Sequence, residues 1–282
     1  MVTGSTGYIG GRIAAHLDAT GWDVTPWSRD PGPTGVPFQL GQHVSAAAFD
    51  GASALVHCAY DLGAHQWADI ERVNVDGSIE LLNAAKRAGM ERIVVISSVS
   101  AFDGCRSLYG RAKLEIEGAA FSVGATVIRP GLVWGDRPGG VLGGLVNQVC
   151  SSRVIPAIDG GRHIQYLAHD ADLAELVRIA LEGSVGSSDA VFAGHPQPWS
   201  LRQILVTIAQ QAGRRPIFLH VPWQLAWLGL RTFERIGVRT PFRSDSVVSI
   251  VHQNPELPAV HGTDFGVQFR AFAPTPSMLT RR

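Results

Sequence analysis

The chain is poor in the residues that build disulfide frameworks and metal sites. Its 282 residues include only three cysteines, Cys58, Cys105 and Cys150, which lie far apart and show no CxxC spacing. A disulfide scaffold or a structural zinc site is therefore not expected, and reduced thiols predict a cytoplasmic protein. The ten histidines form no HxH or HExxH pattern, so no catalytic metal is expected either.

Charge and long apolar runs are also scarce. Charged residues make up 17% of the chain, and Lys plus Arg equal Asp plus Glu at 24 each. A zero balance gives no general attraction to nucleic acid or anionic lipid, so the expected partner is a small-molecule substrate. No apolar run reaches the ~20 residues of a membrane span. Met1 leads straight into a glycine-rich turn, so no signal peptide is expected.

What the chain does contain is an alternation of strand-like and helix-like segments. The expected strands are 22–27, 36–40, 53–60, 92–98 and 125–131, and the helices between the later ones are 70–89 and 109–121. Apolar strands separated by helices predict a parallel sheet covered on both faces. We therefore expect an α/β, Rossmann-type doubly wound sheet with a smaller, mainly helical C-terminal substrate lobe. The dinucleotide-binding domain is expected over 1–135, with 164–195 returning to it, and the lobe over 136–163 and 196–282.

Helical patterns dominate the second half. They cover 139–150, 169–183 with Asp170 or Asp172 as cap, 200–213 with Ser200 as N-cap, and 221–237 with Pro222 in the first turn. The stretch "IFLHVPWQLAWLGL" (217–230) is unusually apolar. We expect this stretch to lie in the core. The alternatives, in order of preference, are a dimer face and a lid over an apolar substrate.

The stretch "VTGSTGYIGG" (2–11) carries glycines at every third position, Gly4, Gly7 and Gly10, before an amphipathic helix. A glycine turn between a strand and a helix lets backbone N–H groups and the helix N-terminus hold a pyrophosphate. Only three residues precede Gly4, which is short for a central strand. We expect either that the native start lies upstream or that the first strand is stunted.

The second strand ends in Ser28-Arg29-Asp30, where an adenosine ribose is normally met. A hydroxyl beside a guanidinium suits a 2′-phosphate, so NADP(H) is favoured. The alternative is NAD(H), with Arg29 in solvent and Asp30 on the ribose hydroxyls.

Tyr109 and Lys113 lie four residues apart on one face of a predicted helix. A phenol needs tuning to act as an acid or base at neutral pH, and a neighbouring ammonium is expected to lower its pKa. Such a pair can protonate a carbonyl oxygen while a nicotinamide delivers hydride, or run the reverse.

These motifs resemble the extended short-chain dehydrogenase/reductase family, in its NAD(P)-dependent epimerase/dehydratase branch. The matching stretches are "TGSTGYIG" (3–10), "HCA" (57–59), "NVDGSIELLNAA" (74–85), "VVISS" (94–98), "YGRAK" (109–113), "RPGLVWG" (129–135) and "HDADLA" (169–174). They follow the family's order over about two thirds of the chain, and many members of the family form homodimers.

The resemblance implies roles at matching positions. The implied catalytic residues are Ser98, Tyr109, Lys113 and Asn74. The implied cofactor-binding residues are Gly4, Thr6, Gly7, Tyr8, Ile9, Gly10, Ser28, Arg29, Leu40, His57, Cys58, Ala59, Lys113, Arg129, Pro130 and Gly131. The implied substrate residues are Tyr60, Ser100, Phe102 and Trp134, and no metal ligand is implied.

Two departures from the family pattern bear on the reaction. The loop between Ser98 and Tyr109 is short for the extended branch, so Ser97 and Ser100 stay alternatives to Ser98. Leu132 and Val133 stand where sugar-nucleotide members usually carry Asn, which weakens the case for a nucleotide sugar. Net ketone reduction is favoured over epimerisation or dehydration with a recycled cofactor. A cofactor-binding sensor without turnover is the alternative from another class.

The cluster His169, Asp170 and Asp172 is a helix start or a metal-ligand set. We expect a helix start packed against the cofactor domain, because the spacing does not match a metal motif.

Overall fold

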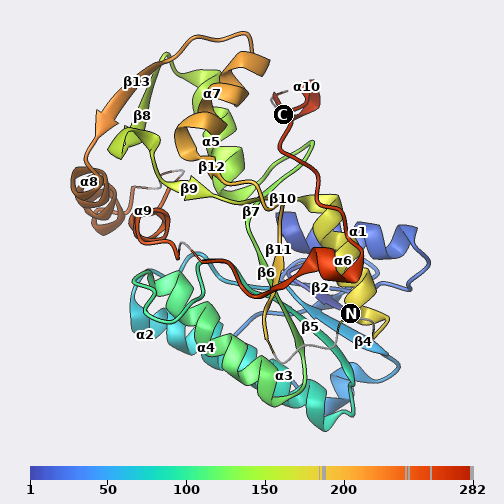
Figure 1. Ribbon diagram of the computed structural model, residues 1–282. Helices are drawn as coiled ribbons and strands as arrows, with labels where there is room; N and C mark the ends of the chain where they lie inside the picture. The colour runs from blue at the N-terminus through green and yellow to red at the C-terminus, as the bar shows by residue number, and fades with distance from the viewer. Residues whose placement is uncertain (184, 186–188, 239, 241, 255, 280–282) are drawn as a thin grey trace.

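A parallel sheet forms the centre of the molecule. Figure 1 shows the computed structural model, which describes residues 1–183, 185, 189–238, 240, 242–254 and 256–279. The strand order is β14-β11-β6-β5-β4-β1-β2-β3, and every neighbouring pair is parallel. The strands are β1 (Val2–Thr3), β2 (Pro26–Ser28), β3 (Val36–Pro37), β4 (Ala54–His57), β5 (Arg92–Ile96), β6 (Thr126–Pro130), β11 (Val191–Ala193) and β14 (Val260–His261). This confirms the predicted Rossmann-type fold.

Helices cover both faces of the sheet. On one face, α1 (Tyr8–Ala19) packs with α6 (Asp170–Leu181), and Ile13 and Leu173 are buried in the core between them and the sheet. On the other face lie α2 (Trp67–Ile70), the π-helical segment η2 (Glu71–Asp76), α3 (Gly77–Arg87) and α4 (Leu108–Ser122). The short 3-10 helix η1 (Ala46–Phe49) precedes β4.

Two predicted elements differ from the structure, and a third has the short length that the sequence indicates. The strand expected over 22–27 is β2 at 26–28, because Trp22 and Val24 pack into the core under α1 instead of joining the sheet. The helix expected over 70–89 is divided by the π-helical turn. The first strand, β1, has two residues and is as stunted as the sequence indicates, yet it pairs with β2 and β4 on its two sides.

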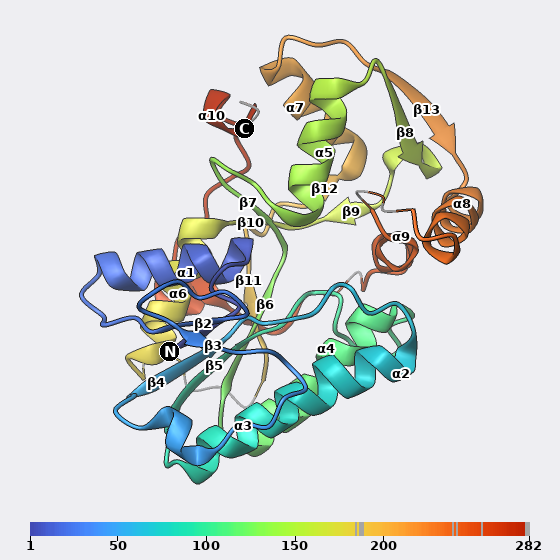
Figure 2. The ribbon, with the colours of Figure 1, turned by 180° about the vertical axis from the view of Figure 1, so that it is seen from behind.

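The lobe lies beyond the carboxyl ends of β5 and β6 (Figures 1 and 2). Its helices are α5 (Gly140–Ser151), α7 (Leu201–Gln211), α8 (Trp223–Arg235), α9 (Ser244–Val251) and α10 (Pro276–Leu279). Short ribbons complete it: β7 (Leu132–Trp134) with β10 (Leu167–His169), β8 (Val154–Ile158) with β13 (Ile217–Val221), and β9 (Ile164–Gln165) with β12 (Trp199–Ser200). The 3-10 helix η3 (Asp159–Gly161) lies in one of its connections, whereas η4 (Gly262–Phe265) follows β14 and packs against α6 and β11 of the central domain.

The lobe helices begin largely where the sequence indicates. Ser200 caps α7, as predicted, and exchanges hydrogen bonds with Gln203 in a capping box. Pro222 is the N-cap of α8 and does not lie inside its first turn. The expectation that 217–230 lies in the core is wrong, because α8 has no buried residue and Ile217, Leu219 and Leu225 are exposed. Within the part of the chain that the structure describes, no helix is long and apolar enough to cross a membrane.

Candidate active site

The backbone of the glycine turn packs so closely against its neighbours that side chains at Gly4 and Gly10 would not fit. Gly4 has φ +67°, and a Cβ there would come within 2.9 Å of the Ala59 backbone. A Cβ on Gly10 would lie well inside van der Waals contact with the carbonyl oxygen of Gly4. Gly7 is the N-cap of α1 and carries no capping side chain. The first N–H groups of α1 therefore remain available to a phosphate.

A cavity of about 270 Å³ opens beside this turn. Nine of the residues assigned from the sequence line it: Gly4, Thr6, Gly7, Ser28, Arg29, Leu40, Cys58, Ala59 and Tyr60. Ser28 ends β2, and its buried hydroxyl has no hydrogen-bond partner among the described residues. An unpartnered buried hydroxyl beside a glycine turn fits a bound dinucleotide, which would satisfy it.

Burial keeps the Cys58 side chain uncharged. It raises the pKa of the thiol to about 12. This cysteine is therefore a protonated wall residue of the cavity and not a nucleophile.

A chain of hydrogen bonds beneath the cavity fixes the end of β4. The Thr3 hydroxyl accepts the N–H groups of Cys58 and Ala59 at 3.1 and 3.2 Å and lies 2.8 Å from Nδ1 of His57. Because both lone pairs of that hydroxyl are used, its proton goes to Nδ1, and Nε2–H of His57 donates to Ser78 at 2.9 Å. Burial, with a smaller contribution from the Lys113 charge, lowers the pKa of His57 to about 3. This buried histidine supports the cavity without lining it.

Tyr109 stands in the first turn of α4, next to the loop that follows β5. Ser107 is the N-cap of this helix and accepts the N–H of Gly110. The Tyr109 ring meets the Tyr60 ring edge-on at 5.0 Å between centroids. Burial raises the pKa of Tyr109 to about 12, and a side-chain hydrogen bond with Ser98 acts in the opposite direction. The phenol is therefore protonated at neutral pH.

Lys113 lies one turn further along α4, behind the two rings. Its Nζ donates to the carbonyl of Ile96 at 2.8 Å and lies 5.9 Å from the centroid of the Tyr109 ring. Burial lowers the pKa of Lys113 to about 8, against the opposing influence of Cys58 and Glu117. The expectation that this ammonium lowers the pKa of Tyr109 is not met in this structure, where burial of the phenol outweighs every other influence.

A second cavity of about 300 Å³ lies between these residues and the lobe. The assigned residues that line it are Tyr8, Ile9, Ser98, Ser100, Tyr109, Pro130 and Gly131. The opposite wall comes from the lobe and includes Arg243, Asp245, Ser249 and Ile250 of α9 and its approach. A protonated phenol that faces such a cavity and touches a serine hydroxyl can donate a proton to a bound carbonyl oxygen.

Ser97 also lines the second cavity, but its hydroxyl and the Arg129 guanidinium are both bonded to Glu117. The Ser97 hydroxyl donates to buried Glu117 at 2.5 Å, and the Arg129 guanidinium pairs with the same carboxylate through two nitrogens. Of the three candidate serines, Ser98 is the one that meets Tyr109. Arg129 lines neither of the two cavities.

Asn74 supports the first cavity from the π-helical turn. Its side chain is fully buried and exchanges two hydrogen bonds with the backbone of Asp61, at 2.6 and 3.1 Å. Asp61 follows β4 and lines the cavity. The extra residue of a π turn commonly occurs where a side chain must be aimed at a functional site.

Three of the four assigned substrate residues do not line the second cavity. Tyr60 lines the first cavity instead. Phe102 lines a different cavity, together with Gln253 and Leu257. Trp134 is 4% exposed and packs edge-on against His169 and Phe272, so it belongs to the core of the lobe.

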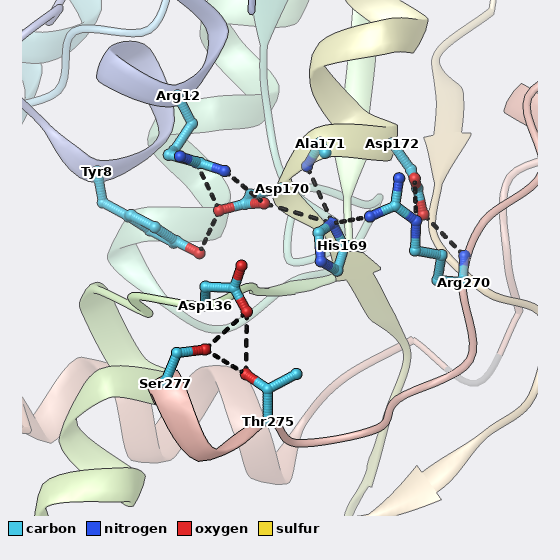
Figure 3. A network of polar contacts seen from close by, with 10 residues as sticks. All are labelled: Tyr8, Arg12, Asp136, His169, Asp170, Ala171, Asp172, Arg270, Thr275 and Ser277. Carbon is cyan, nitrogen blue, oxygen red and sulfur yellow. Dashed lines mark hydrogen bonds and ion pairs between the residues drawn. The ribbon is translucent and has the colours of Figure 1, made fainter. Parts of the chain in front are cut away.

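The start of α6 ties the cofactor side of the sheet to the lobe (Figure 3). Asp170 accepts hydrogen bonds from Tyr8 at 3.1 Å and Arg12 at 2.8 Å. Asp172 pairs with Arg270 at 3.1 Å. The interpretation of this cluster as a helix start packed on the cofactor domain is confirmed. Its cap is His169, which accepts the N–H of Ala171, and neither predicted aspartate serves as the cap. The described residues include no cluster of three or more groups arranged to hold a metal.

Two functional-site residues were missed in the sequence. Asp245 of α9 accepts the N–H groups of Leu108 and Tyr109 at 2.8 and 2.9 Å. Arg243 donates to the carbonyls of Leu62 and Ala64 at 2.8 and 2.7 Å. The lobe is thus hydrogen-bonded both to the helix that carries Tyr109 and to the loop after β4. No local motif signals these contacts, because the partners lie more than 130 residues apart along the chain.

Comparison with known proteins assigns the architecture to a family. A model described as "NAD dependent epimerase/dehydratase family" matches residues 1–192. A ceramide reductase from Caulobacter vibrioides is 27% identical over 241 residues, which cover 78% of this chain and 73% of that protein. A 4-hydroxy-2-methyl-3-oxo-4-farnesyl-3,4-dihydroquinoline-1-oxide ketoreductase from Stigmatella aurantiaca is 25% identical over 80% of this chain and 77% of its own. Among solved structures, MoeE5 in complex with UDP-glucuronic acid and NAD shares the fold, with a TM-score of 0.68, 23% identity, and coverage of 78% of this chain and 84% of that one.

Proposed function

The chain belongs to the NAD dependent epimerase/dehydratase family, and from this premise we propose that it transfers a hydride between a nicotinamide cofactor and a secondary alcohol or ketone on an apolar substrate. Named relatives include both reductases and epimerases, so the chain is an enzyme of the oxidoreductase or epimerase type. The observation that carries the proposal is the protonated Tyr109, in contact with Ser98, at the wall of a cavity next to the glycine-lined one.

The first cavity would hold the cofactor, with its pyrophosphate at the start of α1. The Ser28 hydroxyl and the neighbouring Arg29 would bind a ribose 2′-phosphate, which is the basis for favouring NADP(H) over NAD(H). When bound, the cofactor supplies or accepts the hydride. NAD(H), with Asp30 on the ribose, is the alternative that a binding comparison decides.

Tyr109 would act as the proton donor to the substrate oxygen. Its pKa of about 12 keeps the proton on the phenol at neutral pH, which suits donation to a ketone better than abstraction from an alcohol. Ser98 would hold the same substrate oxygen through its hydroxyl. Lys113, partly charged near pH 8, would bind the nicotinamide ribose and stabilise the phenolate left after donation.

The lining of the second cavity favours an apolar substrate. Ile9, Leu62, Val99, Leu132 and Val141 all contribute to it. Its single described cation, Arg243, is engaged by two backbone carbonyls. The diphosphate of a nucleotide sugar would need free cations or N–H groups at that wall. The lining therefore supports ketone reduction more than nucleotide-sugar epimerisation.

A test combines NADPH with a panel of ketones that carry long alkyl or isoprenoid chains, and follows nicotinamide oxidation. We expect net NADPH consumption that Tyr109→Phe lowers by roughly 100-fold or more, since general acid catalysis contributes about that much. Tyr166→Phe is the matched control, because Tyr166 lines neither cavity and packs on Phe192. Isomer conversion of a nucleotide sugar without net NADPH use would instead favour an epimerase. Tight cofactor binding with no turnover, unchanged by Tyr109→Phe, would favour a sensor.

A further inference from the structure

The outer side of α8 and the adjoining strand β13 present apolar side chains to solvent. Ile217, Leu219, Leu225, Leu228, Phe233 and Ile236 form what we call the apolar face. Ile217 is 68% exposed, Leu225 62%, Leu228 56% and Ile236 66%. Residues 225, 228, 232 and 236 recur at helical spacing, so Leu225, Leu228 and Ile236 lie on one side of α8. Both views place α8 and β13 together at the outer edge of the lobe (Figures 1 and 2).

The inner side of the same helix has its partners already. Glu234 accepts the N–H and the hydroxyl of Ser244 at 2.7 Å, and the Trp223 ring meets His252 at 5.3 Å. The helix is therefore anchored to α9 by one side. A helix that is apolar on its outer side as well needs a second apolar environment.

Basic residues outnumber acidic ones along this part of the sequence, although the chain as a whole is neutral. In space, Asp159 accepts the N–H of Trp223 at the start of α8, but its carboxylate is already paired with Arg162 and His163. From residue 202 to residue 238 the sequence contains Arg202, Arg214, Arg215, Arg231 and Arg235 but only one acid, Glu234, which faces α9. No ion pair involves these arginines in the described part of the chain. Arg231 lies 5.6 Å from the centroid of the Trp227 ring.

We propose that the apolar face and its arginines dock the protein on the surface of an anionic phospholipid bilayer. A helix with an apolar outer side and arginines without acidic partners has the composition that binds in the headgroup layer. Each arginine near an anionic surface adds to the attraction, and the apolar side chains enter the boundary of the acyl chains. A second copy of the chain would bury the apolar side chains, but it would also bring the same arginines close together, where their charges repel.

The apolar face and the second cavity lie on opposite sides of the α8–α9 pair. Ser246, Ser249 and Ile250 of α9 line that cavity, and α8 packs against α9. A substrate with a hydrocarbon chain would therefore have only a short path from the bilayer to Tyr109. This delivery step rests on the proposed function, whereas docking does not.

Vesicle flotation of the full chain tests the proposal without cofactor or ketone. The probes are phosphatidylcholine vesicles with and without phosphatidylglycerol, at low and high salt. We expect binding to the anionic vesicles that weakens at high salt and is weaker on neutral vesicles. The combined change Leu225→Gln, Leu228→Gln and Ile236→Gln should lower binding by more than tenfold, and Arg231→Gln with Arg235→Gln should remove most of the salt dependence.

Val36→Gln is the matched control, because Val36 is exposed on the edge strand β3, away from α8. None of these positions is buried, and circular dichroism checks that each variant folds. Absent binding to anionic vesicles, or binding that the triple variant retains, would overturn the proposal. A wild-type dimer in sedimentation that the triple variant converts to monomer, with no vesicle binding, would assign the face to subunit contact. Failure of ketone reduction would leave the flotation result standing.

Discussion

Removing the Asp245 carboxylate should weaken both the fold and the reaction. It accepts two backbone N–H groups in the first turn of α4, those of Leu108 and Tyr109, at 2.8 and 2.9 Å. Hydrogen bonds to a charged group contribute about 1.5–3 kcal/mol each, and cavity water would replace part of that. Since Ser107 still caps the helix, we expect Asp245→Ala to lower the free energy of unfolding by about 2 kcal/mol. Asp245→Asn keeps one acceptor and should cost about half as much.

The assay is denaturant unfolding, followed by kcat, KM and cofactor affinity on an active ketone. The first turn of α4 sets the distance from the Tyr109 hydroxyl to the substrate oxygen, so kcat should fall about tenfold, while cofactor affinity stays unchanged. Asp264→Ala is the control, because Asp264 accepts the N–H of His261 in η4, away from the second cavity, and its loss should cost stability alone. If Asp245→Ala lost less than about 0.5 kcal/mol and left kcat intact, the idea that the lobe holds the catalytic helix would be refuted.

Three further outcomes are expected. Gly10→Ala should abolish measurable cofactor binding, because the added Cβ would collide with the carbonyl of Gly4. Gly118→Ala is the control, because Gly118 faces open space on α4, and it should leave binding unchanged. Titration of NADPH fluorescence compares the two variants. Arg29→Gln should reduce NADPH affinity about tenfold and leave NADH affinity nearly unchanged, since one charge-assisted phosphate contact is lost; equal losses for both cofactors would argue against a 2′-phosphate contact. His57 has a folded-state pKa of about 3, below its ordinary 6.5, so as pH falls through that interval the unfolded chain gains a proton that the folded chain excludes, and stability falls by at most about 1.4 kcal/mol per pH unit. His57→Gln should flatten this dependence in urea unfolding between about pH 4.5 and about pH 7, and an unchanged slope would contradict the assignment.

The sheet and the cofactor turn could be predicted because both have local signals. Glycines at fixed spacing, a short apolar strand and a following helix specify the turn between β1 and α1 within a few residues. Runs such as 92–98 are apolar enough to be read as buried strands, and β5 occupies most of that run. Tyr109 and Lys113 lie together because helical spacing alone brings them to one face.

The remaining features depend on tertiary contacts that local patterns do not contain. His169 caps α6 because its ring is held between Asp170 and Arg270, although capping preferences favour the aspartates. The pKa of Tyr109 follows from its burial in the folded protein, which a spacing rule cannot estimate. For α8, apolar composition does not tell an inner side from an outer one, and the expectation of a core position was wrong for that reason.

The π-helical turn at 71–76 makes the length of this segment matter as much as its composition. Each residue of an α-helix turns the chain by about 100° and advances it by about 1.5 Å. One residue fewer between α2 and α3 would let the segment wind regularly, but it would rotate one helix against the other by that angle. Either Asn74 would swing away from Asp61, or Leu81 and Leu82 would leave the core. A single-codon deletion here should therefore be far more damaging than most substitutions in the same segment.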